Sequence, residues 1–356
     1  MKLGFQHDAL YGVTNWLKDD VKTAGPGTWC KVLNPDHGEP APFGLDVTYL
    51  GRLWWNGEPD KGTIEQGAAG AERWWAMARD RIRACPWIKV WCSPNEPNLN
   101  AFNDGGPDYD AAKRKAEVFG AWANRRLAIL HNEGLQDCLG EFSTGSPFLV
   151  LWEILGQIRP DYWGIHEYGM KNLDDNQVNS YHLYRHEKIF TELQSLGLPP
   201  GRWLITEKGI DFSGNPQKDG WQAQGISEGD YLRGMLGVKA RCDPFPQLIA
   251  SMPFIWNHPG WPSFNFTQVL SRGWALAAKA DQSPPVGRPL PSDEPVARVK
   301  TVASKVRWWN EEYARQVEKG DRAYAEEIMY SLINLDDGLL YRLERALERE
   351  NPNILA

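Results

Sequence analysis

Two glutamates in this chain each follow a short apolar run, in settings suited to acid–base chemistry. Glu96 stands between Asn95 and Pro97 in the segment WCSPNEPN, and Glu207 ends the run WLITE. Two carboxylates that converge on one site can cleave a glycosidic bond, one as acid/base and one as nucleophile. A lone glutamate is usually solvated or supports a neighbouring group. The interpretation therefore depends on whether the fold brings Glu96 and Glu207 together.

The elements that have to position these glutamates are predicted by an alternation of apolar runs and amphipathic stretches. The expected strands are 2–7, 28–33, 47–53, 88–93, 137–142, 162–167, 203–207 and 248–256. The clearest expected helices are 63–84, 109–134, 181–197 and 227–241. Strands that alternate with helices indicate βαβ units and a parallel sheet. Eight such units in roughly 270 residues match an α/β fold of the (β/α)₈ TIM-barrel type.

The chain divides by composition near residue 281. Residues 1–281 are expected to form the barrel that carries the site. Residues 282–295 are rich in proline, which indicates a surface crossing, and residues 296–349 have the pattern of charged amphipathic helices. We expect residues 282–356 to provide this crossing, a helix that closes the barrel, and a C-terminal helical extension beyond it.

A barrel places its working groups at the C-terminal ends of its strands. Glu96 follows the fourth expected strand and Glu207 ends the seventh, and these two strands face each other across the mouth. Glu96 has to carry a proton for the leaving oxygen, whereas Glu207 has to be ionised. Two carboxylates this close do not both ionise easily, so each tunes the other.

The segment Asn95-Glu96-Pro97, together with Thr206-Glu207, resembles the clan A glycoside hydrolases, which include the family 5 cellulases and mannanases. The resemblance spans residues 1 to about 270 and implies a retaining double displacement at a β-linked sugar. It also implies that Asn95 binds the sugar 2-hydroxyl, that Glu96 is the acid/base and that Glu207 is the nucleophile.

Other strand ends resemble the same clan. His166 and Tyr168 form a His-x-Tyr motif on the sixth strand, and in the clan this tyrosine hydroxyl bonds the nucleophile. Trp256, at the end of the eighth strand, is similar to the clan's sugar platform. Arg52, on the third strand, matches the arginine that the family 5 pattern places on an early strand.

Several further residues near the expected mouth are potential sugar contacts. Glu141 ends the fifth strand and either binds a sugar hydroxyl or supports another group. Trp54, His258 and Trp261 lie in loops after strands three and eight, where we expect subsite contacts. The chain has 18 tryptophans. Because a buried indole N–H needs a partner, this surplus suggests flat platforms that face a ligand.

Two polar residues are interpreted as structural. Glu167 lies between His166 and Tyr168, so strand alternation turns it toward the outer layer. His186 has no second histidine four residues on, which excludes the HExxH metalloprotease motif. We expect His186 to lie on a solvated helix face.

The composition and the net charge limit the classes of partner and the cellular location that we expect for the protein. A formal net charge of −7 disfavours nucleic acid as a partner, and no apolar stretch approaches the ~20 residues that span a bilayer. The five cysteines are widely spaced without a C-x-x-C pair, so no disulfide framework is expected. The N-terminus runs directly into a strand, which predicts a cytoplasmic protein, or a secreted one if a leader precedes the given sequence.

The favoured reading is a retaining hydrolase of β-linked oligo- or polysaccharide that needs no cofactor and no metal. Three alternatives stay open. A barrel can bind carbohydrate without cutting it, and a transglycosidase can use the same two glutamates with another acceptor. A metal-dependent hydrolase would need a His/Asp cluster on several strands, and His7-Asp8 and His166 are the only residues that fit.

Overall fold

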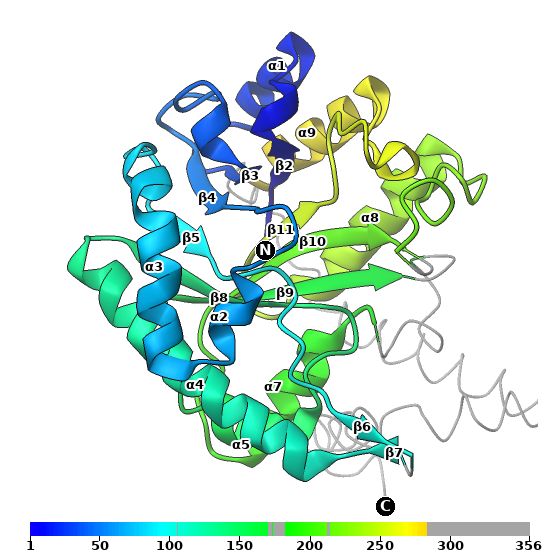
Figure 1. Ribbon diagram of the computed structural model, residues 1–356. Coiled ribbons are helices and arrows are strands. Elements are labelled where there is room, and N and C mark those ends of the chain that lie inside the picture. The colour runs from blue at the N-terminus through cyan, green and yellow to red at the C-terminus, as the bar shows by residue number, and fades with distance from the viewer. Residues whose placement is uncertain (105, 170–172, 174–181, 212–213, 283–356) are drawn as a thin grey trace, which may run out of the picture. The chain divides into compact units, whose positions relative to one another are not determined.

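Parallel strands close into the barrel that the sequence predicts (Figure 1). The first strand has two pieces, β1 and β2, and seven further strands complete the barrel. The bounds are β1 (Lys2–Leu3), β2 (Phe5–Asp8), β3 (Trp29–Leu33), β4 (Thr48–Arg52), β5 (Val90–Cys92), β8 (Gln136–Phe142), β9 (Tyr162–Gly169), β10 (Trp203–Ile210) and β11 (Leu248–Pro253). Because β1 pairs with β11 while β2 pairs with β3, the sheet closes through the first strand. The (β/α)₈ prediction is confirmed.

The structure, a computed structural model, describes residues 1–104, 106–169, 173, 182–211 and 214–282. The chain forms two compact units, Met1–Pro284 and Pro285–Ala356. The barrel belongs to the first unit. The Pro-rich crossing and the helices expected over 296–349 lie outside the described residues, apart from residue 282 itself.

Helices cover the outer face of the barrel. Their bounds are α1 (Asn15–Ala24), α2 (Lys61–Ile64), α3 (Gly67–Arg83), α4 (Tyr109–Asn132), α5 (Trp152–Leu155), α7 (Arg185–Ser195), α8 (Glu228–Cys242) and α9 (Gln268–Gln282). Shorter elements are the hairpin β6 (Phe102–Asn103) and β7 (Gly106–Pro107), and the 3₁₀ turns at Ala9–Tyr11, Pro35–His37, Leu149–Leu151 and Pro262–Phe264. Two helices begin at caps visible in the sequence, since Asp108 accepts from the Ala111 N–H and Ser227 from the Asp230 N–H.

The last helix of the barrel is α9, which follows the eighth strand and packs beside α1 (Figure 1). The Trp274 indole on α9 donates to the carbonyl oxygen of Gly4, which joins this helix to the first strand. We expected a helix within 282–356 to close the barrel. The structure corrects this expectation, because α9 already occupies that position.

Ten of the 16 tryptophans that the structure describes are buried instead of facing a ligand. Trp122, Trp152, Trp203 and Trp274 are fully buried between strands and helices. Trp122 donates to the Thr63 hydroxyl at 3.2 Å, and the indole N–H groups of Trp203 and Trp274 donate to backbone carbonyl oxygens, whereas that of Trp152 has no partner among the described residues. The surplus of tryptophan is therefore mainly a feature of the core. All five cysteines are buried and free. Among the described helices, none has the length and apolar character needed to cross a membrane.

One polar pair lies inside the outer layer. Glu167 on β9 faces outward, as alternation predicts, and its carboxylate lies 2.7 Å from Nδ1 of His186. The same carboxylate accepts the backbone N–H groups of Tyr184 and His186 at the start of α7. His186 is completely buried. The expected solvated face is therefore wrong for this histidine, because Glu167 draws the first turn of α7 onto the sheet.

Candidate active site

Irregular strand pairing shapes the mouth of the barrel. The pairing of β10 with β9 shifts between Ile205 and Glu207, which sets Glu207 opposite His166. The pairing of β8 with β9 shifts after Leu139, where Glu141 has a positive φ of 41°. Extra residues of this kind re-aim side chains at barrel rims. Glu207 and His166 thereby point into the same space.

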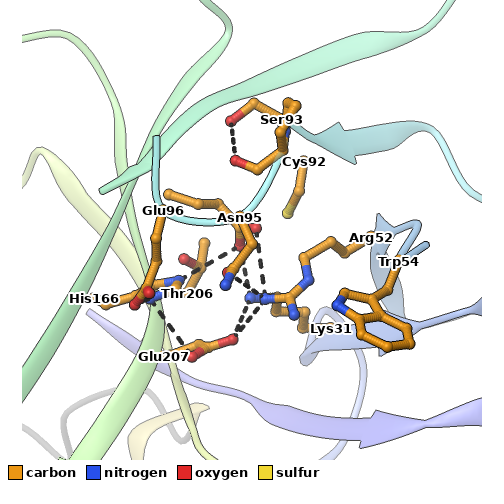
Figure 2. Close-up of polar contacts among 12 residues, drawn as sticks. Lys31, Arg52, Trp54, Cys92, Ser93, Asn95, Glu96, His166, Thr206 and Glu207 are labelled. Atoms are coloured by element: carbon orange, nitrogen blue, oxygen red, sulfur yellow. Dashed lines mark hydrogen bonds and ion pairs between the residues drawn. The ribbon is translucent and has the colours of Figure 1, made fainter. Parts of the chain in front are cut away.

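Glu207 is held by donors from four other strands, and Figure 2 shows two of these donors, Lys31 and Arg52. Its Oε1 atom accepts from Arg52 Nη1 at 2.8 Å, from Lys31 Nζ at 3.1 Å and from Gln6 Nε2 at 3.3 Å. Its Oε2 atom accepts from the Tyr168 hydroxyl at 2.9 Å. This arrangement fixes the carboxylate in one orientation.

The charges around Glu207 keep it ionised. Burial by itself would raise the pKa of this carboxyl, but the positive charges of His166, Lys31 and Arg52 outweigh burial and lower the pKa to about 2. The side chain is only 8% exposed, so water does little to screen these charges. Glu207 therefore carries a negative charge throughout the neutral range.

His166 connects the two glutamates (Figure 2). Its Nδ1 atom lies 2.8 Å from Oε1 of Glu96 and 3.5 Å from Oε2 of Glu207. Burial lowers the pKa of the imidazole, but Glu207, Glu141 and Glu96 together raise it to about 9. The ring is completely buried, whereas Glu96 is 37% exposed at the mouth. Glu96 is thus open to the cleft while its carboxylate is anchored by the buried imidazole.

Asn95 and Arg52 share a contact beside the two glutamates. Arg52 Nη1 donates to Asn95 Oδ1 at 2.6 Å as well as to Glu207. One guanidinium therefore orients both the amide next to Glu96 and the carboxylate of Glu207. Arg52, Asn95, Glu96 and Tyr168 all lie where the sequence placed them, at the C-terminal ends of their strands.

Glu141 lies behind the site instead of in it. Its carboxylate is completely buried, and Oε1 lies 2.6 Å from Lys31 Nζ. Since it does not line the cleft, it is not placed to meet a sugar, and the first of the two expectations for Glu141 is corrected. The bulge in β8 turns the side chain down into the barrel, where Lys31 separates it from Glu207.

A cleft of about 450 Å³ opens above the two glutamates. It is lined by Asp8, Leu10, Tyr11, Leu33, Asn34, Arg52, Trp54, Glu58, Asn95, Glu96, Tyr168, Glu207, Asp211, Gly214, Phe254, Ile255, His258, Trp261 and Phe264. Trp54, His258 and Trp261 are thus in its walls, with Trp54 43% exposed. Aromatic faces beside polar side chains suit a ligand that has both C–H faces and hydroxyl groups.

Trp256 does not line this cleft. The side chain is 1% exposed, with its ring against Phe5 and Phe266 at centroid distances of 5.1 and 4.2 Å. Its indole N–H donates to the Ser271 hydroxyl on α9 at 2.9 Å. The expected sugar platform is therefore corrected. The strand ends at Pro253, and by Trp256 the chain has turned so that this ring packs under α9, while Phe254 and Trp261 reach the cleft.

Four polar residues in or beneath the site were given no role in catalysis or sugar binding from the sequence. Gln6 and Lys31 contact Glu207 from the first two strands. A signal existed for Lys31, because a lysine inside the apolar run TWCKVL needs a carboxylate partner if that strand is buried. Gln6 has no comparable signal.

The other two are Asn34 and Asp8, which the sequence suggested only as a metal ligand, and both line the cleft. Asp8 Oδ1 accepts from the Leu10 N–H at 3.0 Å and from Asn34 Nδ2 at 3.3 Å, and Oδ2 lies 3.4 Å from His258 Nε2. Asp8 ends the first strand, which is the position that marks working groups in a barrel. Within the described ranges, no set of three or more His, Cys, Asp or Glu side chains is arranged to hold a metal ion.

No protein-family model matches the chain, and no curated protein matches it. Solved structures similar to it include a GH128 subgroup II endo-β-1,3-glucanase from Sorangium cellulosum, at 18% identity and a TM-score of 0.44, over 78% of this chain and 98% of that one. A GH128 subgroup III curdlan-specific exo-β-1,3-glucanase from Blastomyces gilchristii has 18% identity and a TM-score of 0.43, over 77% and 97%. The endo-β-1,4-glucanase B of Bacillus halodurans has 12% identity and a TM-score of 0.47, over 78% and 60%. The chemistry of this site therefore rests on its own residues.

Proposed function

We propose that the protein is a retaining glycoside hydrolase of the clan A type that cleaves β-linked oligo- or polysaccharide. One observation carries the proposal: Glu96 and Glu207 contact the same imidazole but have opposite surroundings. Glu207 is buried among four donors, whereas Glu96 is open to the cleft. Glycoside hydrolysis needs this pairing of a permanently ionised carboxylate with one that gains and loses a proton.

The separation of the two glutamates supports a covalent intermediate. Oε1 of Glu96 and Oε2 of Glu207 lie 2.8 and 3.5 Å from the same nitrogen, so they are at most about 6.3 Å apart, the sum of these distances. Enzymes in which water attacks directly keep their carboxyl groups roughly 6.5–9.5 Å apart, to leave room for that water. A nucleophilic role for Glu207 fits the shorter separation.

In the first step, Glu207 attacks the anomeric carbon while Glu96 gives its proton to the leaving oxygen. A bond forms between Glu207 and the sugar, the glycosidic bond breaks, and Glu96 becomes a carboxylate. Arg52 and Tyr168 hold Glu207 in line for this attack. Asn95, oriented by Arg52, is placed to bond a sugar hydroxyl, which is the role that the clan A resemblance implies.

In the second step, Glu96 takes a proton from a water molecule that attacks the same carbon. The bond to Glu207 breaks, the carboxylate charge returns to it, and the product keeps the β configuration. The donors around Glu207 stabilise the returning charge because they are already in place. Trp54 and Trp261 in the cleft walls supply faces on which sugar rings can stack.

The test is hydrolysis of β-linked aryl glycosides, glucan, mannan, xylan and galactan, with Glu207→Gln measured in parallel. We expect one substrate class to turn over and the variant to lose about three orders of magnitude or more in kcat. Proton NMR of the first product formed should show the β anomer. A first product with the α configuration would contradict the retaining mechanism.

Two other results would identify the alternative functions. Binding of a polysaccharide without cleavage, in the native protein, would identify a carbohydrate-binding barrel. Predominant transfer to added sugar acceptors, with the same loss in Glu207→Gln, would identify a transglycosidase. A matched check is azide rescue of Glu207→Ala, which should yield an α-glycosyl azide only if Glu207 is the nucleophile.

A further inference from the structure

A lysine stands between two carboxylates beneath the active site. Lys31 Nζ lies 2.6 Å from Oε1 of Glu141. The same atom lies 3.1 Å from Oε1 of Glu207 (Figure 2). Lys31 and Glu141 are completely buried and neither lines the cleft. Neither side chain is therefore placed to touch a substrate, and their effect on the reaction has to pass through Glu207.

Keeping this pair buried is unfavourable unless it serves Glu207. A buried ion pair is often no more stable than apolar residues of the same volume. Arg52 already bonds the same oxygen of Glu207 at 2.8 Å, and Tyr168 bonds the other. Lys31 therefore adds a further positive charge to those of Arg52 and His166 beside Glu207, and Glu141 adds a negative charge that offsets it.

We propose that Lys31 is a positioning residue that tunes Glu207 as nucleophile and leaving group, and that Glu141 is the counter-ion that keeps Lys31 paired while Glu207 is esterified. The proposal rests on the proposed function, because only a covalent cycle removes and restores the charge of Glu207.

The charge balance of that cycle explains why both residues are present. When the bond between Glu207 and the anomeric carbon forms, the carboxylate loses its negative charge. Lys31, Arg52 and His166 would then face a neutral ester in a buried place. Glu141 stays 2.6 Å from Lys31 and compensates the charge of that lysine. When water breaks the ester, the negative charge returns next to an ammonium already in position.

Lys31 and Glu141 should have opposite effects on the formation and the breakdown of the glycosyl-enzyme. Lys31 stabilises the ionised carboxylate, which makes Glu207 a weaker nucleophile and a better leaving group. Removing Lys31 should therefore slow breakdown of the glycosyl-enzyme relative to its formation. Glu141 offsets Lys31, so neutralising Glu141 should slow formation relative to breakdown. A purely structural role would lower both steps together.

The kinetic experiment compares Lys31→Met, Glu141→Gln and the double variant on an aryl glycoside that the native protein cleaves. For Lys31→Met we expect kcat to fall at least about tenfold with a parallel fall in KM, and glycosyl-enzyme to accumulate in intact-mass spectra. For Glu141→Gln we expect kcat/KM to fall without accumulation. The double variant restores the charge balance, and its ratio of the two rates should return toward the native value.

A control and a second readout separate this proposal from the proposed function. Lys208→Met removes an equally buried lysine from the outer face of β10, and it should leave the ratio of the two rates unchanged. NMR titration of ¹³C-labelled glutamate, with Glu207 assigned through Glu207→Gln, should show the pKa of Glu207 raised in Lys31→Met. This titration needs no substrate.

The outcomes are distinct. If no substrate is cleaved but the pKa of Glu207 rises in Lys31→Met, the proposed function is contradicted while the effect of Lys31 on Glu207 is supported. If substrate is cleaved but Lys31→Met and Glu141→Gln change the two steps alike, or the titration does not move, the role of Lys31 is overturned. Should Lys31→Met fail to fold, the double variant, which leaves no unpaired buried charge, is compared with Glu141→Gln. These two variants differ only in Lys31, so the pKa of Glu207 should be higher in the double variant.

Discussion

The backbone N–H of Glu96 donates to the carbonyl oxygen of Glu141 over 3.1 Å, and both residues have left-handed backbone conformations, with φ of 49° and 41°. Positive φ is uncommon for residues other than glycine and is found where surrounding structure over-determines it, often at functional sites. This bond ties the loop that carries Glu96, the proposed acid/base, to the bulge in β8. The position of Glu96 therefore depends on the shape of the neighbouring strand.

Gly140→Ala should disturb this bulge. Gly140 has a φ of 105°, and an added Cβ would lie 2.6 Å from Cε2 of Phe142. We expect a loss of about 1–3 kcal/mol in the free energy of unfolding and a clear fall in kcat, because Glu96 moves with its hydrogen-bond partner. Urea unfolding and turnover measure the two effects. Gly134→Ala is the matched control, since Gly134 has a φ of 70° with no atom near the added Cβ. It should cost stability only. Full activity in Gly140→Ala would contradict the coupling.

Tyr168→Phe should weaken the site without unfolding it. The change removes the hydroxyl that donates to Oε2 of Glu207 at 2.9 Å. Burial and the charge of Glu207 hold the pKa of Tyr168 well above its ordinary value, so the hydroxyl remains a donor across the neutral range. We expect kcat to fall by about 10- to 100-fold at all pH values from 5 to 8. Tyr162→Phe, deeper on the same strand, removes a hydroxyl that bonds Arg202 instead, and it should change kcat little.

Trp256 and Trp261 should respond differently to removal. Trp261→Ala takes away a wall of the cleft and is expected to raise KM for oligosaccharide, with little change in unfolding. Trp256→Ala empties a core position under α9 and should lower the free energy of unfolding by about 3–5 kcal/mol. Its KM should stay near the native value while the protein is folded. A large rise in KM for Trp256→Ala, without one for Trp261→Ala, would contradict the core position of Trp256 and indicate that it contacts the substrate.

The pair of Glu167 and His186 should make stability depend on pH. Burial lowers the pKa of His186, but Glu167 and Cys242 raise it to about 10. A raised pKa means that this contribution is complete below the unfolded value of 6.5 and is lost as the pH rises through about 10. Burial raises the pKa of Glu167, but His186 outweighs it and lowers the pKa, so the Glu167 contribution is lost only in acid.

His186→Gln should therefore destabilise the protein at pH 7 by about 3–5 kcal/mol, because Glu167 is left buried without its cation. Urea unfolding from pH 6 to 10 should show a smaller alkaline decline in the variant than in the native protein. His166 titrates near pH 9 in both proteins and so cancels in the comparison. Equal declines in the two proteins would show that His186 is neutral in the fold. The double change Glu167→Gln with His186→Gln should recover part of the lost stability.

The sequence by itself determined the order of the elements and the two glutamates that end strands four and seven. Those features are local, so they can be recognised without knowing what packs against them. They are the apolar runs of strand length, the caps at Asp108 and Ser227, and the breaks at glycine and proline. Because TIM barrels carry their functional groups at the C-terminal ends of the strands, the sequence also predicted that Glu96 and Glu207 lie close together. The clan A resemblance then added Arg52, Asn95, His166 and Tyr168 to the candidate site.

Only the tertiary structure decided which polar side chains meet inside the barrel and which aromatic rings reach the cleft. Lys31 and Glu141 meet because a bulge in β8 changes its register with β9. The alternation of apolar and polar residues in a single sequence does not reveal such a change. Trp256 lies in the core because α9 packs over it, and His186 is buried because α7, which carries it, packs against Glu167 on β9. Contacts of this kind join residues far apart in the chain, so they are decided by register and packing and not by local pattern.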